Sequence, residues 1–130
     1  MTTLRDLQAL AQLTGAVFAT QQAQMGALRQ AEQAIRDKLA GLENARRARA
    51  LSLTDPDPAL LAGADLLWQT WIEQRRAALN GDLSRVLLAQ ETARAALGRA
   101  FGRDQVTEAL NARARSDRVK TKARRDEGAS

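Results

Sequence analysis

One cluster of helix-breaking residues near the middle of the chain constrains the fold more than any other feature. It spans residues 54–58 (TDPDP), and both prolines of the 130-residue chain lie in it. A residue that precedes a proline avoids the α-helical region, so neither aspartate of the cluster continues a helix. Runs of roughly equal length, about 3–50 and about 65–114, flank the cluster and contain no proline. The sequence therefore predicts two long helices joined by one short connection.

The composition favours an extended pair of helices over a compact core. Alanine (27 residues) and leucine (19) supply most of the apolar side chains, whereas Phe and Trp number two each and Tyr is absent. Alanine stabilises a helical backbone but buries little apolar surface. We therefore expect an all-α fold, a long two-helix antiparallel coiled-coil hairpin that occupies residues 1–114. Its expected parts are a helix over about 3–51, a turn over about 52–58 and a helix over about 58–114.

Apolar residues recur every seven positions, as they do along the seam of a coiled coil. In the first helix one series consists of Leu7, Thr14, Gln21, Leu28, Ile35 and Leu42. We interpret the alternate series as Leu10, Val17, Gln24 and Ala31, with Phe18, Met25 and Leu39 widening the seam. In the second helix the series are Ile72, Leu79, Val86 and Ala93, and Leu83, Gln90 and Leu97. The glutamines in the first helix are expected to cost stability and to fix the register.

Local signals set the expected ends of the helices. A hydroxyl at Thr2 or Thr3 can cap the first helix. The second helix can begin at the prolines of the cluster, with Asp55 or Asp57 as the capping carboxylate and Pro58 as the expected start. If Gly63 breaks off the first turn, it begins at Asp65 instead, and the sequence leaves both starts open. Residues 111–130 carry seven basic and three acidic side chains. We expect residues 115–130 to form a basic, disordered tail.

Several classes of function have little support in the sequence. The chain contains neither cysteine nor histidine, which argues against disulfides, thiol chemistry, zinc or haem sites and a Ser-His-Asp triad. No glycine-rich phosphate loop is present. We also expect the second helix to offer no inward polar residues that match Arg29, Arg36 and Lys38 of the first helix, as a chorismate-mutase-like helical site would require. We expect no enzyme, no cofactor and no metal. The longest apolar stretch near the N-terminus, residues 15–19, is too short for a membrane span, so we expect a cytoplasmic protein.

Aromatic and basic residues near the connection have two interpretations each. Trp68 and Trp71 either anchor the helix pair by packing or offer an exposed contact surface to a partner. The arginines of residues 46–49 and 75–76 are either ordinary solvated side chains or a basic belt. The basic C-terminal residues are likewise either solvated or a patch for an acidic partner. Nucleic-acid binding has weak support, because no aromatic residue or glycine-rich loop accompanies the arginines.

The segments LLAQETARAAL (residues 87–97) and VTEAL (residues 106–110) accompany two equal Ala/Leu/Gln/Arg-rich helices and a basic C-terminal end. In these features the chain resembles, over about residues 4–115, the small stalk proteins of type III export systems, the flagellar FliJ and injectisome YscO family. The resemblance implies a central stalk of a hexameric export ATPase, analogous to the γ subunit of rotary ATPases. It also implies contacts with the cytoplasmic domain of the export gate and with export chaperones, which would hold the chain at the membrane only through its partners.

Positions carried over from the resemblance give two expected surfaces. The ATPase-facing end would comprise Arg5, Arg113, Arg115 and Arg118. The surface for the gate and chaperones would comprise Leu39, Leu42, Arg46, Trp68, Trp71 and Arg75. The alternative function is a cytoplasmic coiled-coil scaffold or adaptor that forms a homodimeric helical bundle.

Overall fold

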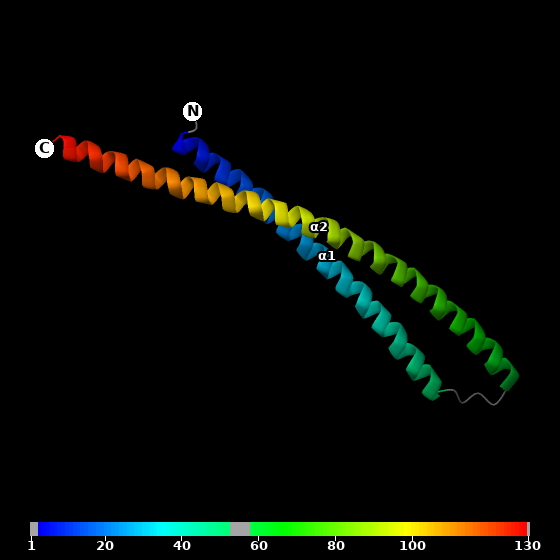
Figure 1. Ribbon diagram of the computed structural model, residues 1–130. Coiled ribbons are helices and arrows are strands. Elements are labelled where there is room, and N and C mark those ends of the chain that lie inside the picture. Colours follow the sequence, from blue (N-terminus) through cyan, green and yellow to red (C-terminus); the bar gives the residue numbers. More distant parts are fainter. Residues whose placement is uncertain (1–2, 53–57, 130) are drawn as a thin grey trace. The chain divides into compact units, whose positions relative to one another are not determined.

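The computed structural model describes residues 3–52 and 58–129, and this part of the chain forms two α-helices (Figure 1). Helix α1 spans Leu4–Ser52 and helix α2 spans Pro58–Gly128. The two helices pack against each other, which confirms the predicted all-α helical hairpin. Contacts divide the described residues into a terminal unit (3–26 and 92–129) and a closed unit (27–52 and 58–91). Each unit is an antiparallel pair of helical segments and is described by itself.

Helix α1 begins with a reciprocal cap between two side chains. The N–H of Asp6 donates to Thr3 Oγ1 at 3.1 Å, and the N–H of Thr3 donates to Asp6 Oδ2 at 3.3 Å. These bonds satisfy amides that lack partners inside the helix. Of the two predicted caps, Thr3 therefore acts as the cap, while Thr2 lies outside the described residues. The helix ends at Ser52, close to the predicted end.

Helix α2 begins at Pro58, the earlier of the two predicted starts. Proline suits the first turn because its missing N–H would have no helical partner there and its φ angle is already helical. Gly63 is part of the helix and does not interrupt it. The expected capping aspartates and most of the expected turn, residues 53–57, lie outside the described residues.

The C-terminal prediction was wrong, because α2 does not end near Ala114 and continues to Gly128. Residues 115–127 contain neither glycine nor proline, and arginine, lysine, alanine and glutamate, which favour helix, make up most of them. The hydroxyl of Thr121 also donates to the carbonyl oxygen of Asp117 at 2.9 Å. The high charge of this segment makes it polar without removing its helical propensity.

The seam of α1 follows alternating steps of four and three residues, and each of its positions is buried or half-buried. These are Leu4, Leu7, Ala11, Thr14, Phe18, Gln21, Met25, Leu28, Glu32, Ile35, Leu39 and Leu42. The first predicted series is therefore part of the seam, but the alternate series is shifted by one residue. Leu10 and Val17 are 43% and 41% exposed. A step of four after each residue of the first series is favoured over a step of three, because it brings the larger side chains Phe18, Met25 and Leu39 to the partner helix.

The seam of α2 keeps the same rhythm but contains smaller and more polar residues in its C-terminal half. From Leu79 onward its positions are Leu79, Leu83, Val86, Gln90, Ala93, Leu97, Ala100, Asp104, Thr107, Asn111 and Ala114. Among these, Gln90, Thr107 and Asn111 are buried polar residues. Small and polar side chains bury less apolar surface than leucine, so hydrogen bonds take a larger part in specifying how these helices pair.

In the terminal unit, polar contacts set the register. Asn111 Nδ2 donates to the carbonyl oxygen of Leu7 at 2.9 Å, and Thr14 Oγ1 donates to Asp104 Oδ1 at 3.1 Å. A step of seven residues along α1 is thus matched by a step of seven back along α2. The rings of Phe18 and Phe101 follow, with centroids 5.5 Å apart.

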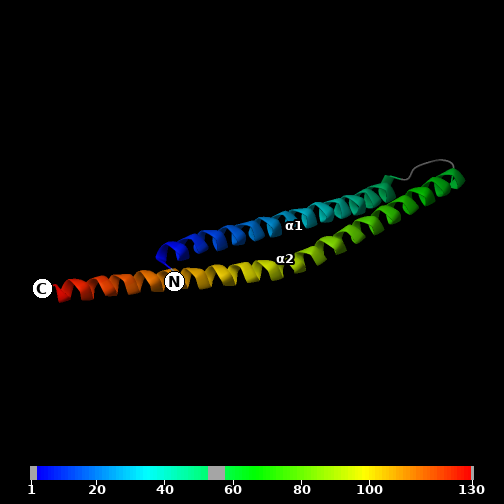
Figure 2. The ribbon, with the colours of Figure 1, turned by 90° about the horizontal axis from the view of Figure 1, so that it is seen from above.

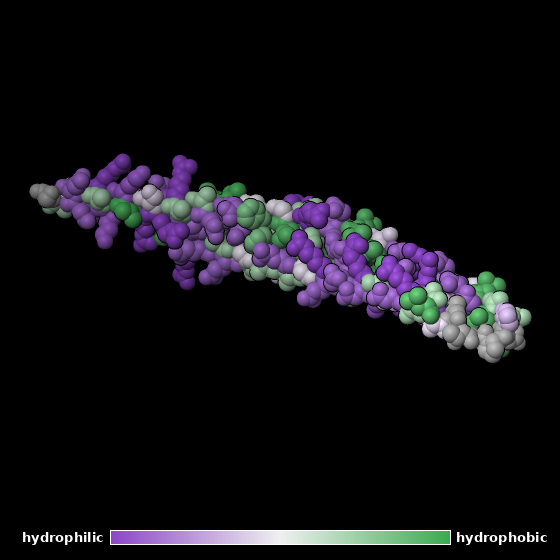
Figure 3. Space-filling view, turned by 90° about the horizontal axis from the view of Figure 1, so that it is seen from below, coloured by the Kyte–Doolittle hydropathy of each residue, from purple (hydrophilic) through white to green (hydrophobic). Residues whose placement is uncertain are grey.

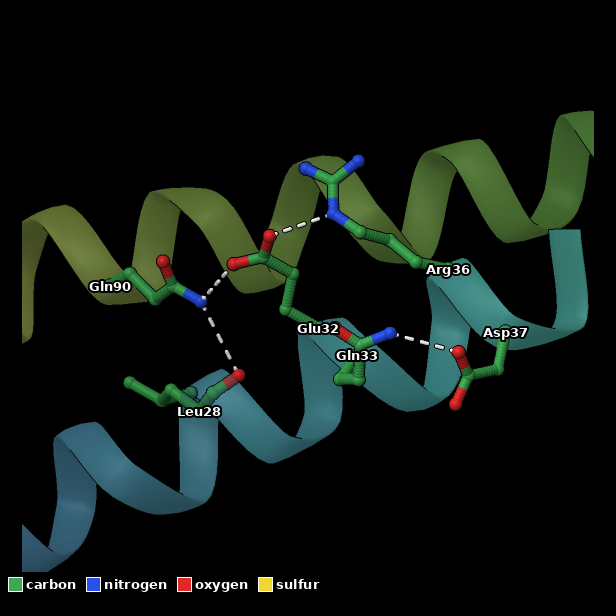
Figure 4. A network of polar contacts seen from close by, with 6 residues as sticks. All are labelled: Leu28, Glu32, Gln33, Arg36, Asp37 and Gln90. Atoms are coloured by element: carbon green, nitrogen blue, oxygen red, sulfur yellow. Dashed lines mark hydrogen bonds and ion pairs between the residues drawn. The ribbon is translucent and has the colours of Figure 1, made fainter. Parts of the chain in front are cut away.

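In the closed unit, a network around Glu32 sets the register (Figure 4). Gln90 Nε2 donates to Glu32 Oε1 at 2.8 Å and to the carbonyl oxygen of Leu28 at 3.3 Å. Arg36 Nε donates to the other carboxylate oxygen, Oε2, at 2.7 Å. The hydrogen bond from Gln90, followed by that from Arg36, holds the pKa of Glu32 below its ordinary value.

Neither helix has, within its described residues, an apolar stretch of the length that a membrane crossing requires.

Candidate interaction surfaces

The last four turns of α2 extend past the start of α1 in the terminal unit. Helix α1 begins at Leu4, and Leu7 already pairs with Asn111. Figures 1 and 2 both show the C-terminal part of α2 continuing beyond that start. Every residue from Arg115 to Ala129 is exposed. At a rise of 1.5 Å per residue this segment is about 20 Å long.

Cations occupy the face of this segment that continues the seam. Arg115, Arg118, Lys122 and Arg125 follow one another in steps of three, four and three residues, so they share one side of α2. The seam rhythm itself, extended from Asn111 and Ala114, reaches Arg118, Thr121 and Arg125, so two of these three positions are cations. We call these four residues the basic ridge. The helix face that covers α1 further back thus carries mainly positive charges here, and most side chains of this end are hydrophilic in Figure 3.

The four residues expected at the ATPase-facing end all lie in the terminal unit, and all are exposed. Arg5 is in the first turn of α1, whereas Arg113, Arg115 and Arg118 belong to α2. Arg115 lines a shallow cavity of about 370 Å³ together with Gln8, Ala11, Gln12, Glu108 and Asn111. Arg113 lies outside the basic ridge. Lys122 and Arg125 were missed because the segment was expected to be disordered, and only a helix places them in line with Arg115 and Arg118.

The closed unit carries a groove between its two helices. Two adjoining cavities of about 370 and 380 Å³ share Glu43, Arg46 and Arg47 in their linings. The first is completed by Leu39, Leu42, Ile72, Arg76 and Asn80, and the second by Arg49, Ala50, Asp65, Trp68 and Gln69. We call the two cavities together the closed-unit groove. It follows α1 for about three turns, from Leu39 to Ala50.

The arginines of the groove retain much of their capacity to donate hydrogen bonds. Arg46 and Arg47 both contact Glu43, at 3.9 and 3.5 Å, and Arg76 contacts Glu73 at 3.7 Å. Each distance joins one guanidinium nitrogen to one carboxylate oxygen, and none is short enough for a strong charge-assisted hydrogen bond. A guanidinium has several N–H donors in a planar fork, so an incoming carboxylate can still bind to each of these arginines.

Arg49 is held more closely than the other groove arginines. Its guanidinium carbon lies 4.7 Å from the ring centroid of Trp68, and its Nε lies 3.4 Å from Asp65 Oδ1. Trp68 is half-buried under this contact, whereas Trp71 is 54% exposed. The two tryptophans therefore divide between the two predicted interpretations, one packed against the helix pair and the other open to solvent.

The structure brings together four of the six residues expected at the gate and chaperone surface. Leu39, Leu42, Arg46 and Trp68 line the closed-unit groove, whereas Trp71 and Arg75 are exposed and lie outside its lining. Sequence reasoning did not assign Arg47 and Arg76 to this surface. Both belong to the basic belt that the sequence suggests, and antiparallel pairing brings them to one groove.

Large apolar side chains are also exposed on both sides of the undescribed linker. They are Leu51, Leu60, Leu66, Leu67 and Trp71, each more than half exposed. Hydrophobic atoms gather beside the linker in Figure 3. Leu60, Leu67 and Trp71 are spaced by seven and four residues, so they share a side of α2.

Among the described residues, no cluster of three or more histidine, cysteine, aspartate or glutamate side chains could hold a metal ion. Comparison with protein-family models, curated proteins and solved structures finds no match to this chain.

Proposed function

We propose that this chain is a non-enzymatic component of a bacterial flagellar or type III protein export apparatus. In this proposal it acts as the central stalk of a hexameric export ATPase and links the ATPase to the export gate and to chaperones in the cytoplasm. The terminal unit faces the ATPase, and the closed unit meets the other partners.

The basic ridge is the observation that carries the proposal. A stalk that enters the pore of an ATPase ring needs a narrow end. The single exposed helix at the C-terminal end of α2 meets that requirement. Four cations on one side of that helix repel one another at spacings of three and four residues. Acidic groups on a partner would neutralise this repulsion. Binding of the segment inside a negatively charged opening is therefore electrostatically favourable.

Affinity capture from the native cytoplasm tests the proposal. One variant replaces the basic ridge (Arg115→Gln, Arg118→Gln, Lys122→Gln, Arg125→Gln). A matched control removes four charges from the closed unit (Arg46→Gln, Arg47→Gln, Arg75→Gln, Arg76→Gln). The wild type and the control should capture an export ATPase, and the ridge variant should not. Failure of the wild type to capture an ATPase, or equal capture by all three proteins, would contradict the proposal.

The exposed leucines and Trp71 beside the linker favour a second candidate, a homodimeric scaffold. Two copies could cover these side chains by packing α2 against α2. Sedimentation equilibrium of the purified chain separates the two candidates, because the scaffold requires a stable dimer that Leu67→Ser and Trp71→Ser dissociate. A monomer at micromolar concentration would contradict the scaffold.

A further inference from the structure

We infer that the closed-unit groove binds an acidic amphipathic helix of a partner protein. The inference rests on the proposed function, in which the closed unit meets a second partner, and it specifies the chemistry of that partner. It is carried by the charge, the apolar floor and the length of the groove.

The charge of the groove selects an acidic occupant. In the first cavity Arg46, Arg47 and Arg76 face a lining whose single acidic member is Glu43. Their contacts with carboxylates are single and long, between 3.5 and 3.9 Å. Carboxylates on a partner would form shorter, paired contacts with these guanidinium groups and would leave Glu43 in its present place.

The floor of the groove favours a helix with an apolar face over a nucleic acid. The half-buried Leu39 and Leu42 line the first cavity, beside Ile72, which is only 2% exposed. A phosphate backbone gains nothing from these aliphatic side chains, whereas leucines of an amphipathic helix do. Trp68 offers no open platform for a base, because the guanidinium of Arg49 lies over its ring.

The length of the groove matches a short helical segment. The lining extends along α1 from Leu39 to Ala50. At 1.5 Å per residue this distance is about 16 Å, which three turns of a bound helix would cover. Acidic side chains of the bound helix would then meet the arginines on either side of its apolar stripe.

Binding of a synthetic peptide to the purified, full-length chain tests the inference without any ATPase. The probe is a fluorescent amphipathic peptide of alanine, leucine and glutamate, and a peptide with lysine in place of glutamate serves as its control. Fluorescence anisotropy should detect binding of the glutamate peptide alone, and this binding should weaken as salt is added. Removal of two groove charges, Arg46→Gln with Arg47→Gln, should weaken binding about tenfold, which corresponds to about 1.4 kcal/mol.

A matched variant, Arg29→Gln with Arg85→Gln, removes two charges from the same unit outside the groove lining. It should bind the glutamate peptide within about twofold of the wild type, and circular dichroism should show that both variants remain helical. Equal loss in both variants, or equal binding of the lysine peptide, would overturn the inference. So would a duplex DNA oligonucleotide that binds more tightly than the peptide with the same dependence on Arg46 and Arg47, or a chain dimer that the groove variant dissociates.

These outcomes are separate from those of the ATPase test. Loss of ATPase capture in the ridge variant concerns the terminal unit, and loss of peptide binding in the groove variant concerns the closed unit. If the chain binds the glutamate peptide and captures no ATPase, the result supports the groove as a docking site and contradicts the stalk function.

Discussion

Asn111 donates through its side-chain amide to the main-chain carbonyl oxygen of Leu7, 2.9 Å away on the partner helix. The same amide also donates to the carbonyl oxygen of Thr107 at 3.3 Å. Asn111 is only 5% exposed, and its Oδ1 is buried without a hydrogen-bond partner. The residue thus fixes the pairing of the terminal unit and carries an energetic cost for doing so.

Asn111→Leu should therefore stabilise the terminal unit while weakening its specificity. The substitution removes the unsatisfied carbonyl and adds apolar contact, so we expect the free energy of unfolding to rise by about 1 kcal/mol. Urea unfolding followed by circular dichroism measures this change. Thr121→Leu, at an exposed position of α2, is the control and should alter stability by less than about 0.5 kcal/mol. A clear loss of stability in Asn111→Leu would mean that its hydrogen bonds outweigh the buried carbonyl.

Engineered cysteines should report the register of the terminal unit directly, because the chain has no cysteine of its own. Thr14 Oγ1 and Asp104 Oδ1 lie 3.1 Å apart, so Thr14→Cys with Asp104→Cys should form an intramolecular disulfide under mild oxidation. Thr14→Cys with Asn111→Cys is offset by seven residues and should remain reduced. Mobility on non-reducing gels distinguishes the two. Similar oxidation of both pairs would show that the helices slide past each other.

Acid should weaken the closed unit through Glu32. Hydrogen bonds from Gln90 and Arg36 hold the pKa of this carboxyl below its ordinary value of 4.5, so the ionised form favours the folded state. This contribution is complete above the ordinary pKa and is lost as the pH falls through the lowered one. The stability difference between the wild type and Glu32→Gln should therefore shrink between about pH 6 and about pH 3. Urea unfolding at a series of pH values measures it, and a difference that grows in acid would contradict the assignment.

Removal of the segment after Ala114 should leave the stability of the remaining chain nearly unchanged. Every residue from Arg115 to Ala129 is exposed, so the described part of the removed segment contains no buried side chain. We expect the free energy of unfolding to change by less than about 0.5 kcal/mol. Urea unfolding of the truncated and full-length proteins checks this. A large loss of stability would show that the segment packs against the chain, which would conflict with its use as an exposed docking end.

The sequence was sufficient for the architecture, because proline placement and a seven-residue rhythm are strong local signals. The sequence does not decide whether Leu10 or Ala11 lies in the seam. Steps of three and of four both leave an apolar stripe on an isolated helix, and the partner helix selects between them. The end of α2 was missed for a different reason: charge predicted disorder at residues 115–130, while helix propensity prevails through Gly128.

The candidate surfaces were only partly accessible from the sequence. Arg46 and Arg76 are distant along the chain, and their approach depends on a pairing register that Gln90, Glu32 and Leu28 specify. The glutamines that the sequence predicts to set the register lie at residues 21 and 24 of α1. In the structure Gln90, Asp104 and Asn111 of α2 provide those contacts, because polar seam residues fix register where they find a partner on the other helix.

The stoichiometry of the proposed complex with an export ATPase tests the central claim most directly. A central stalk occupies the single axis of a ring, so native mass spectrometry should find one copy of this chain per ATPase hexamer. The ridge variant with Arg115, Arg118, Lys122 and Arg125 replaced by glutamine should not form that complex. Six copies per ring, or no complex with the wild-type chain, would contradict the account.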